Sequence, residues 1–189
     1  RNFSDSRLWY IGRMRLSAAA MDSVAELIVS YLAAVQGKTK KCLVLDLDNT
    51  LWGGIVGEDG INGLNLGEEL TGRAYRDFQR EIVNLYGTGI ILAVNSLNNY
   101  DEAIEVIRTH PGMVLKETHF AAVKINWKNK ADNLQEISKT LNIGLDSMVY
   151  LDDDPRQRSL IREMLPEVAV PDLPDDPAEF PQFIVEIAY

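Results

Sequence analysis

The sequence predicts an α/β protein, built as a three-layer, doubly wound and mostly parallel sheet. Short apolar segments with the length of buried strands alternate along the chain with longer segments whose apolar residues recur at helical spacing. Several strand segments run directly into aspartate or serine, and the carboxyl ends of parallel strands are where open α/β sheets bind ligands. A chain of 189 residues is long enough for one such domain and too short for two ordinary ones.

Residues 1–16 are mixed aromatic and basic without a clear period, and we expect an extended arm there. Ser17 resembles a helix N-cap, and the apolar stripe after it predicts a helix to about Gln36. We therefore divide the chain into an N-terminal arm and helix, residues 1–37, and a main domain, residues 38–189. Because the sequence begins with an arginine, we expect it to be a piece of a longer polypeptide.

The main domain opens with the stretch 41–50, KCLVLDLDNT, whose apolar run ends in two carboxylates, Asp46 and Asp48. A carboxylate at a strand end is exposed to substrate yet held by a rigid element, which suits a metal ligand or a covalent nucleophile. Taken alone, the same residues fit a strand running into an Asx turn equally well. The glycine-rich stretch 51–67 that follows predicts a flap beside the acids.

The rest of the main domain continues the alternation of predicted strands and helices. Asn98 and Asn99 can cap the helix after the second strand, and Pro155 suits the first position of a helix capped by Asp154. No long insertion separates the elements, so we expect no large cap domain. The expected elements are a helix at 70–86, a strand at 89–96, a helix from about 100, a strand at 120–125, a helix at 130–141, a strand at 148–151, a helix at 155–165, a short strand at 168–170 and a polar tail.

Composition narrows the classes of function. The formal net charge of -9 and the pI near 4.7 argue against a nucleic-acid partner. The single cysteine, Cys42, lies in the predicted first strand, so we expect no disulfide framework and a cytoplasmic setting. No apolar run reaches membrane-spanning length, so we expect no membrane partner.

Polar groups of defined type follow the predicted strand ends or begin a helix: Asp46 with Asp48, Ser96, Lys130, and Asp152 with Asp153. Parallel strands put them at one edge of the sheet. Such a carboxylate cluster repels itself unless a hard cation lies in it, and Mg²⁺ prefers oxygen ligands. A hydroxyl and a lysine beside the metal would bind phosphoryl oxygens. One aspartate is then free to attack phosphorus, and its neighbour two positions on can protonate the leaving oxygen.

Two other kinds of acidic site do not match the spacing. An EF-hand loop starting at Asp46 requires glycine at its sixth position and glutamate at its twelfth, where this sequence has Leu51 and Gly57. In a receiver domain the acid pair lies on the first strand and the lysine on the last, whereas here the acid pair follows the lysine. The order found here, DxDxT, then Ser, then Lys, then Asp-Asp, resembles the haloacid dehalogenase superfamily of Mg²⁺-dependent phosphotransferases.

A closer resemblance covers nearly the whole chain. The segments that resemble the FkbH-like family are DSRLWYIGRMRLS, KCLVLDLDNTLWGGIVGEDG, HPGMVLKETHFAAVKINW through KNKADNL, LNIGLDSMVYLDDDPRQR and LPEVAVPDLP. This resemblance implies a catalytic domain of the Rossmann-like haloacid dehalogenase type at residues 38–189. It also implies a reaction of polyketide biosynthesis. A glyceryl unit is taken from a bisphosphorylated glycerate, phosphate is released, and the acyl group passes to the phosphopantetheine arm of an acyl carrier protein.

The resemblance also implies residue roles. Asp46 would be the nucleophile, Asp48 the acid/base, and Ser96 and Lys130 the phosphate-binding residues. The Mg²⁺ ligands would be Asp46, the backbone carbonyl of Asp48, and Asp153, with Asp152 in support.

Five further residues are candidates on the substrate side: Asn49, Thr50, Trp52, Asn98 and Arg156. Trp52 either lines the pocket mouth or packs in the core. Arg156 either reaches the substrate phosphate or is a solvated residue in the first turn of its helix.

The sequence departs from the family pattern at the end of the second strand. FkbH-like members usually read Cys-Ser-Lys-Asn-Asn there, whereas this chain has Asn95 and Leu97 at the cysteine and lysine positions. Asparagine cannot form a thioester, so the acyl group passes directly to the carrier, or another acyl unit is used, or transfer is lost. The alternatives to acyl transfer are a simple phosphatase or phosphotransferase on a small metabolite or protein, and a docking domain with impaired catalysis.

Overall fold

The computed structural model describes residues 4–17, 20–25, 28–29 and 39–187. The chain divides into two compact units, residues 1–39 and 40–189, and each is described by itself.

The N-terminal unit contains a short helix, α1 (Ser6–Gly12), where the sequence led us to expect an extended arm. That expectation was wrong because Asp5 is an N-cap whose carboxylate accepts a hydrogen bond from the Arg7 backbone N–H at 2.9 Å. The helix ends at Arg13, which has a left-handed backbone conformation with φ 57°.

The helix expected from Ser17 to Gln36 is described only in part. Residues 20–25 and 28–29 are helical, and the Ser17 hydroxyl accepts a hydrogen bond from the Ala20 N–H at 3.2 Å. The rest of this predicted helix lies outside the described residues.

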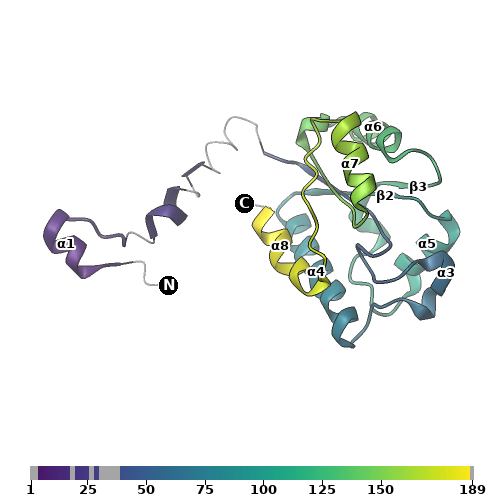
Figure 1. Ribbon diagram of the computed structural model, residues 1–189, viewed down its shortest axis with the longest axis horizontal. Coiled ribbons are helices and arrows are strands. Elements are labelled where there is room, and N and C mark those ends of the chain that lie inside the picture. The colour runs from purple at the N-terminus through teal and green to yellow at the C-terminus, as the bar shows by residue number, and fades with distance from the viewer. Residues whose placement is uncertain (1–3, 18–19, 26–27, 30–38, 188–189) are drawn as a thin grey trace. The chain divides into compact units, whose positions relative to one another are not determined.

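A four-stranded parallel sheet forms the centre of the larger unit. Figure 1 shows strands of this sheet among the helices of the unit. Its strands are β1 (Cys42–Leu45), β2 (Ile91–Ser96), β3 (Phe120–Ile125) and β4 (Met148–Leu151), in the spatial order β3-β2-β1-β4. All three strand pairs are parallel, so the predicted fold class is confirmed. The strand expected at 168–170 is reduced to a single bridge between Val149 and Ala169.

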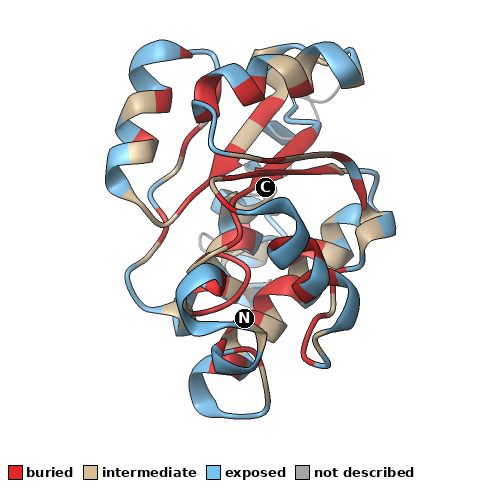
Figure 2. Ribbon diagram, turned by 90° about the vertical axis from the view of Figure 1, so that its right-hand side faces the viewer, coloured by how far each residue is buried: buried red, intermediate tan, exposed pale blue. Residues whose placement is uncertain are grey.

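Helices cover both faces of this sheet. They are α3 (Val56–Asp59), α4 (Leu70–Gly87), α5 (Tyr100–Thr109), α6 (Lys130–Leu141), α7 (Pro155–Met164) and α8 (Phe180–Ile187). Two apolar cores result because alternate residues of β1 point to opposite faces. Leu43 and Leu45 pack with residues of α4, α5 and α8, whereas Cys42 and Val44 pack with residues of α6 and α7. Figure 2 shows the buried strands between these layers.

The glycine-rich stretch after β1 folds back on itself, as a flap is expected to do. Gly53 and Asn65 exchange two backbone hydrogen bonds at 3.1 and 2.8 Å, and this pair closes a loop that holds α3 and a 3₁₀ turn, Ile61–Gly63. Gly54 has φ 100°, a conformation that side-chain-bearing residues rarely adopt. No separate cap domain is formed by the described residues 46–187.

The C-terminal segment is more ordered than the proline- and aspartate-rich tail we expected. It ends in α8, whose Phe180 ring packs edge-on against Tyr75 and Phe78 of α4, with centroids 5.8 and 5.3 Å apart. The helix has only eight residues, and the proline- and aspartate-rich stretch before it obscures its apolar pattern.

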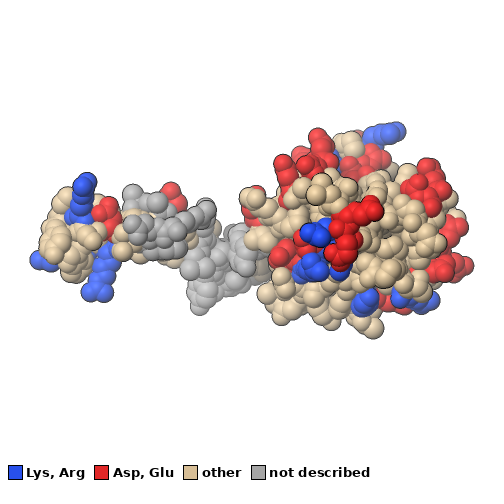
Figure 3. Space-filling view, turned by 90° about the horizontal axis from the view of Figure 1, so that it is seen from below, with Lys and Arg blue, Asp and Glu red and all other residues tan. Residues whose placement is uncertain are grey.

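Charged side chains of both signs are interspersed on the face of the larger unit shown in Figure 3. Exposed ion pairs of this unit include Arg108 with Glu117 at 2.6 Å. Among the described residues, no helix is both long and apolar enough to cross a membrane.

Candidate active site

The parallel sheet brings the sequence-predicted acids to one edge. Because β1 lies between β2 and β4, Asp46 after β1 is flanked by the ends of those two strands. Asp152 follows β4 directly, and Ser96 is the last residue of β2. Lys130, the first residue of α6, joins them because its ammonium lies 3.0 Å from Asp46. These four residues therefore form one cluster, as expected from the strand order.

Two carboxylates of this cluster, together with the neighbouring Asp153, could hold a metal ion. One oxygen each from Asp46, Asp152 and Asp153 lies within 4.8 Å of the others. Asp46 Oδ1 is buried and has no hydrogen-bond partner among the described residues, so it is available as a ligand. Burial, together with the neighbouring carboxylates, raises the pKa of Asp46 to about 6 and that of Asp153 to about 7. A hard divalent cation would relieve this repulsion, so these residues fit Mg²⁺.

Lys130 is the cation that the chain itself supplies. Its side chain is 3% exposed, and its ammonium lies 2.5 Å from Asp152 as well as 3.0 Å from Asp46. Burial lowers its pKa, but the two carboxylates outweigh that effect and hold the pKa above its usual range. Lys130 therefore stays charged and bridges the two acids.

Buried amides hold the start of α6 in place. The register that pairs Leu45 with Val94 makes Asn95 the residue of β2 beside Asp46. The Asn95 side chain donates to the Lys130 carbonyl at 2.9 Å and accepts from Asn133 at 3.0 Å. Asn95 thus connects β2 to the backbone of the lysine.

The turn after β4 is fixed by an arginine that the sequence did not identify. Arg158 is 8% exposed and donates to the carbonyl oxygens of Asp152 and Asp153 at 2.9 and 2.7 Å. Tyr150 adds a hydroxyl hydrogen bond to the Asp152 carboxylate. Arg156, by contrast, is not brought to the site. Its side chain is 93% exposed, and its nearest acid, at 3.7 Å, is the helix cap Asp154.

Asp48 points toward the flap and not into the carboxylate cluster. Its Oδ1 accepts from the Trp52 indole N–H at 2.8 Å and from the Val56 backbone N–H at 3.2 Å. Its Oδ2 accepts from the Asn98 amide at 2.9 Å, and that amide also donates to the Ser96 hydroxyl at 3.2 Å. Asn98 therefore connects the proposed acid/base to the proposed phosphate-binding serine.

The remaining candidates after β1 have structural roles in the flap or lie buried. Asn49 has φ 53°, and its side-chain oxygen accepts from the Gly54 N–H at 2.9 Å, which stabilises the turn. Trp52 is fully buried, so it does not line a pocket mouth. Thr50 is also fully buried, and its hydroxyl has no hydrogen-bond partner among the described residues.

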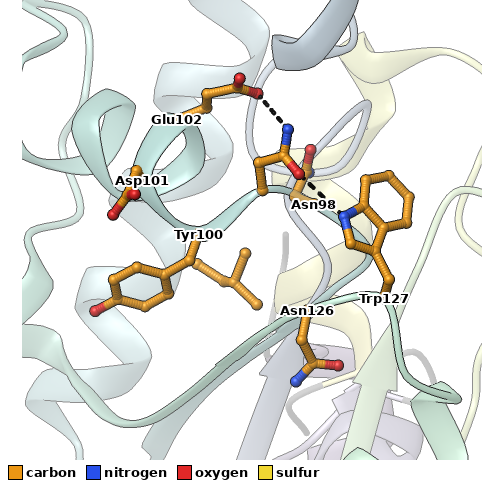
Figure 4. Close-up of a pocket in the computed structure, with 8 residues that line it drawn as sticks. Asn98, Tyr100, Asp101, Glu102, Asn126 and Trp127 are labelled. Atoms are coloured by element: carbon orange, nitrogen blue, oxygen red, sulfur yellow. Dashed lines mark hydrogen bonds between the residues drawn. The ribbon is translucent and has the colours of Figure 1, made fainter.

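An open hollow of about 450 Å³ adjoins Asn98 (Figure 4). Its lining residues are Asn98, Asn99, Tyr100, Asp101, Glu102, Ile125, Asn126 and Trp127. Trp127 is 71% exposed, yet its orientation is fixed because its indole N–H donates to Asn99 at 3.0 Å. The hollow is connected to the residues described above through Asn98, which donates to Asp48 and to Ser96.

No protein-family model and no curated protein matches the chain. It is similar to the crystal structure of the N-terminal part of the protein BF1531 from Bacteroides fragilis, which contains a phosphatase domain complexed with Mg. That similarity has 44% sequence identity and a TM-score of 0.82, and it covers 97% of this chain. The chain spans only 49% of the length of that structure.

Two more distant structures identify the fold. A haloacid dehalogenase-superfamily hydrolase of subfamily IA from Geobacter sulfurreducens has 16% identity and a TM-score of 0.53, over 81% of this chain and 98% of its own. A predicted haloacid dehalogenase-like family hydrolase from Porphyromonas gingivalis has 12% identity and a TM-score of 0.52, over 79% of this chain and 98% of its own. The chain has the haloacid dehalogenase fold. Within this fold the acids after β1 and β4 lie at the ligand-binding edge of the sheet.

Proposed function

We propose that this haloacid dehalogenase-type domain is an Mg²⁺-dependent phosphatase or phosphotransferase that forms a phosphoenzyme on Asp46. The observation that carries the proposal is the environment of Asp46. One of its oxygens is buried and has no hydrogen-bond partner within the described part of the chain, and the other contacts the Lys130 ammonium at 3.0 Å, beside two further carboxylates. The likeness to a phosphatase domain that binds Mg supports the same chemistry.

The residues of the cluster have complementary tasks. Asp46, Asp152 and Asp153 would hold Mg²⁺, which when bound offsets the charge of the carboxylates and of the phosphoryl oxygens. Lys130 and the Ser96 hydroxyl would bind phosphoryl oxygens that lie near Asp46. The asparagines around the start of α6 keep the lysine in place.

The reaction has two chemical steps. An oxygen of Asp46 attacks phosphorus, the bond from phosphorus to the leaving oxygen breaks, and its electron pair stays on that oxygen, which takes a proton from Asp48. Water then attacks the phosphoenzyme while the Asp48 carboxylate takes its proton, and phosphate leaves with Asp46 restored. If the hydroxyl of a second substrate attacks the phosphoenzyme in place of water, the same steps transfer the phosphoryl group to that substrate.

Phosphate release from p-nitrophenyl phosphate and acetyl phosphate, with and without Mg²⁺, tests this proposal. We expect Mg²⁺-dependent release that Asp46→Asn abolishes. Asp77→Asn is a matched control, because Asp77 is an exposed helix residue paired with Arg80. Release that persists in Asp46→Asn would contradict the proposal, and no release from the wild type would favour a docking domain.

We propose further that the substrate is of the phosphoglyceryl type and that the acyl group goes to an acyl carrier protein, as the FkbH-like resemblance implies. The absence of a cap domain in the described residues 46–187 supports this, because an open site admits a carrier's arm. Asn95 offers no thiol, so the carrier thiol itself would attack the carbonyl carbon of the acyl phosphate. The bond from that carbon to the phosphate oxygen breaks, and phosphate leaves with the electron pair and the thiol proton. Asp46 would take the remaining phosphoryl group.

Intact mass spectrometry of a carrier protein, incubated with this protein, Mg²⁺ and 1,3-bisphosphoglycerate, tests the finer proposal. A glyceryl mass on the carrier that depends on Asp46 would support it. Phosphate release without any acylated carrier would refute acyl transfer and leave the simple phosphatase.

A further inference from the structure

We propose that Trp52 is a positioning residue for Asp48, and that Oδ2 of Asp48 is the oxygen that exchanges the proton with substrate. This inference rests on the proposed function, in which Asp48 is the acid/base. It follows from the unequal way in which the two carboxylate oxygens are bonded.

The two oxygens of Asp48 differ in free hydrogen-bonding capacity. A carboxylate oxygen accepts about two hydrogen bonds. Oδ1 already accepts two, from the Trp52 indole at 2.8 Å and from the Val56 backbone N–H at 3.2 Å. Among the residues that the structure describes, Oδ2 accepts one hydrogen bond, from the Asn98 side chain at 2.9 Å, so it keeps capacity for a proton shared with substrate.

The positions of the hydrogen-bond donors show which way each oxygen of Asp48 faces. Oδ1 faces the flap, because both of its donors belong to the segment that follows β1. Oδ2 faces Asn98, which contacts Ser96 at 3.2 Å and lines the open hollow in Figure 4. The oxygen with free capacity is therefore the one on the side of the phosphoryl group and its leaving group.

Trp52 is suited to anchor Oδ1 because it is rigid and can only donate. Its side chain is fully buried, and a buried indole N–H requires an acceptor, which Asp48 supplies. The Gly53–Asn65 backbone pair fixes the chain directly after it. Trp52→Phe removes this N–H together with the five-membered part of the indole, so Oδ1 loses its donor and the carboxylate can rotate, while a six-membered ring still fills most of the buried site.

A variant with a misplaced Asp48 should be slowed only with substrates whose leaving group needs a proton. When Asp46 attacks phosphorus, an alkoxide leaving group needs the proton from Asp48 Oδ2, whereas a p-nitrophenolate leaves without one. A misdirected Asp48 should therefore slow the cleavage of alkyl phosphates and spare p-nitrophenyl phosphate. A general loss of structure would slow both.

The test compares kcat/KM of Trp52→Phe for ethyl phosphate and p-nitrophenyl phosphate, since kcat/KM covers the steps up to phosphoenzyme formation. We expect a loss of about tenfold or more with ethyl phosphate, within the range that general acid catalysis contributes, and about twofold or less with p-nitrophenyl phosphate. Trp9→Phe makes the same chemical change in the N-terminal unit and should alter neither value. An equal loss with both substrates would overturn the inference.

A double mutant and a spectrum complete the test. If Trp52 acts through Asp48, Trp52→Phe should cause no further loss with ethyl phosphate in an Asp48→Asn background. In ¹⁵N spectra, Asp48→Asn should shift the indole N–H signal of Trp52 and leave that of Trp9 in place. Additive losses or an unmoved Trp52 signal would refute the positioning role alone. No Asp46-dependent phosphate release from the wild type would instead refute the proposed function together with this inference.

Discussion

Replacing Lys130 by methionine removes the cation that bridges two buried carboxylates. The ammonium lies 3.0 Å from Asp46 and 2.5 Å from Asp152, and all three side chains are less than 10% exposed. Methionine keeps much of the side-chain length, so the change is mainly one of charge. In metal-free protein it leaves two facing carboxylates without a compensating charge.

Because the three side chains are buried, Lys130→Met should lower the free energy of unfolding by several kcal/mol. Breaking a buried ion pair by removing one partner typically costs about 3–5 kcal/mol, which for a domain of this size lowers Tm by roughly 6–20 °C. The loss depends on pH, because burial already raises the pKa of Asp46 from 3.8 to about 6 and removal of the lysine raises it further. A carboxyl group with a raised folded-state pKa causes no loss below pH 3.8, and the loss grows as pH rises through the folded-state value. We therefore expect the full cost at pH 8 and less than half of it at pH 5.

Urea unfolding in EDTA at pH 5 and pH 8 measures the effect. Lys124→Met is a matched control, because Lys124 forms a partly exposed ion pair with Glu136 at 2.5 Å, and such pairs contribute only about 0–1 kcal/mol. A loss of equal size at both pH values, or one no larger than that of the control, would refute our account of the cluster.

Three further predictions concern the metal site and its supports. In metal-free wild type, Tm should fall from pH 5 to pH 8, because the pKa values of Asp46 and Asp153 are raised to about 6 and 7. Added Mg²⁺ should raise Tm more at pH 8 than at pH 5, because both carboxyl groups are then ionised. An equal rise in Tm with Mg²⁺ at both pH values would contradict this. Arg158→Ala should weaken Mg²⁺ binding about tenfold or more in calorimetric titrations, whereas Arg156→Ala should not change it. Asn95→Cys should cost about 1–3 kcal/mol in urea unfolding, because it removes two buried side-chain hydrogen bonds; an unchanged stability would show that they contribute little.

The sheet and its acids could be predicted because they depend on short-range patterns. A buried parallel strand is a short apolar run, and its carboxyl end is marked by the first polar residue after it. For that reason Asp46, Ser96 and Asp152 could be placed at one edge before the strand pairing was known. Helices such as α6 carry their own caps, and Asn129 at the start of α6 accepts a hydrogen bond from Ala131.

The supports of the site could not be predicted because they depend on side-chain direction. Arg156 and Arg158 lie in the same turn of α7, and only packing decides that Arg158 is buried against the Asp152–Asp153 carbonyls. Likewise, the sequence marks Trp52 as a residue near the acids but does not show that its indole donates to Asp48.

Peptide mapping by mass spectrometry can show whether Asp46 becomes phosphorylated. The protein is mixed with Mg²⁺ and acetyl phosphate, quenched in acid within the first turnover, and digested. We predict a phosphoryl group on the peptide that contains Asp46, absent without Mg²⁺ and absent in Asp46→Asn. A phosphoryl group on another residue, or phosphate release with no phosphorylated intermediate, would contradict the account.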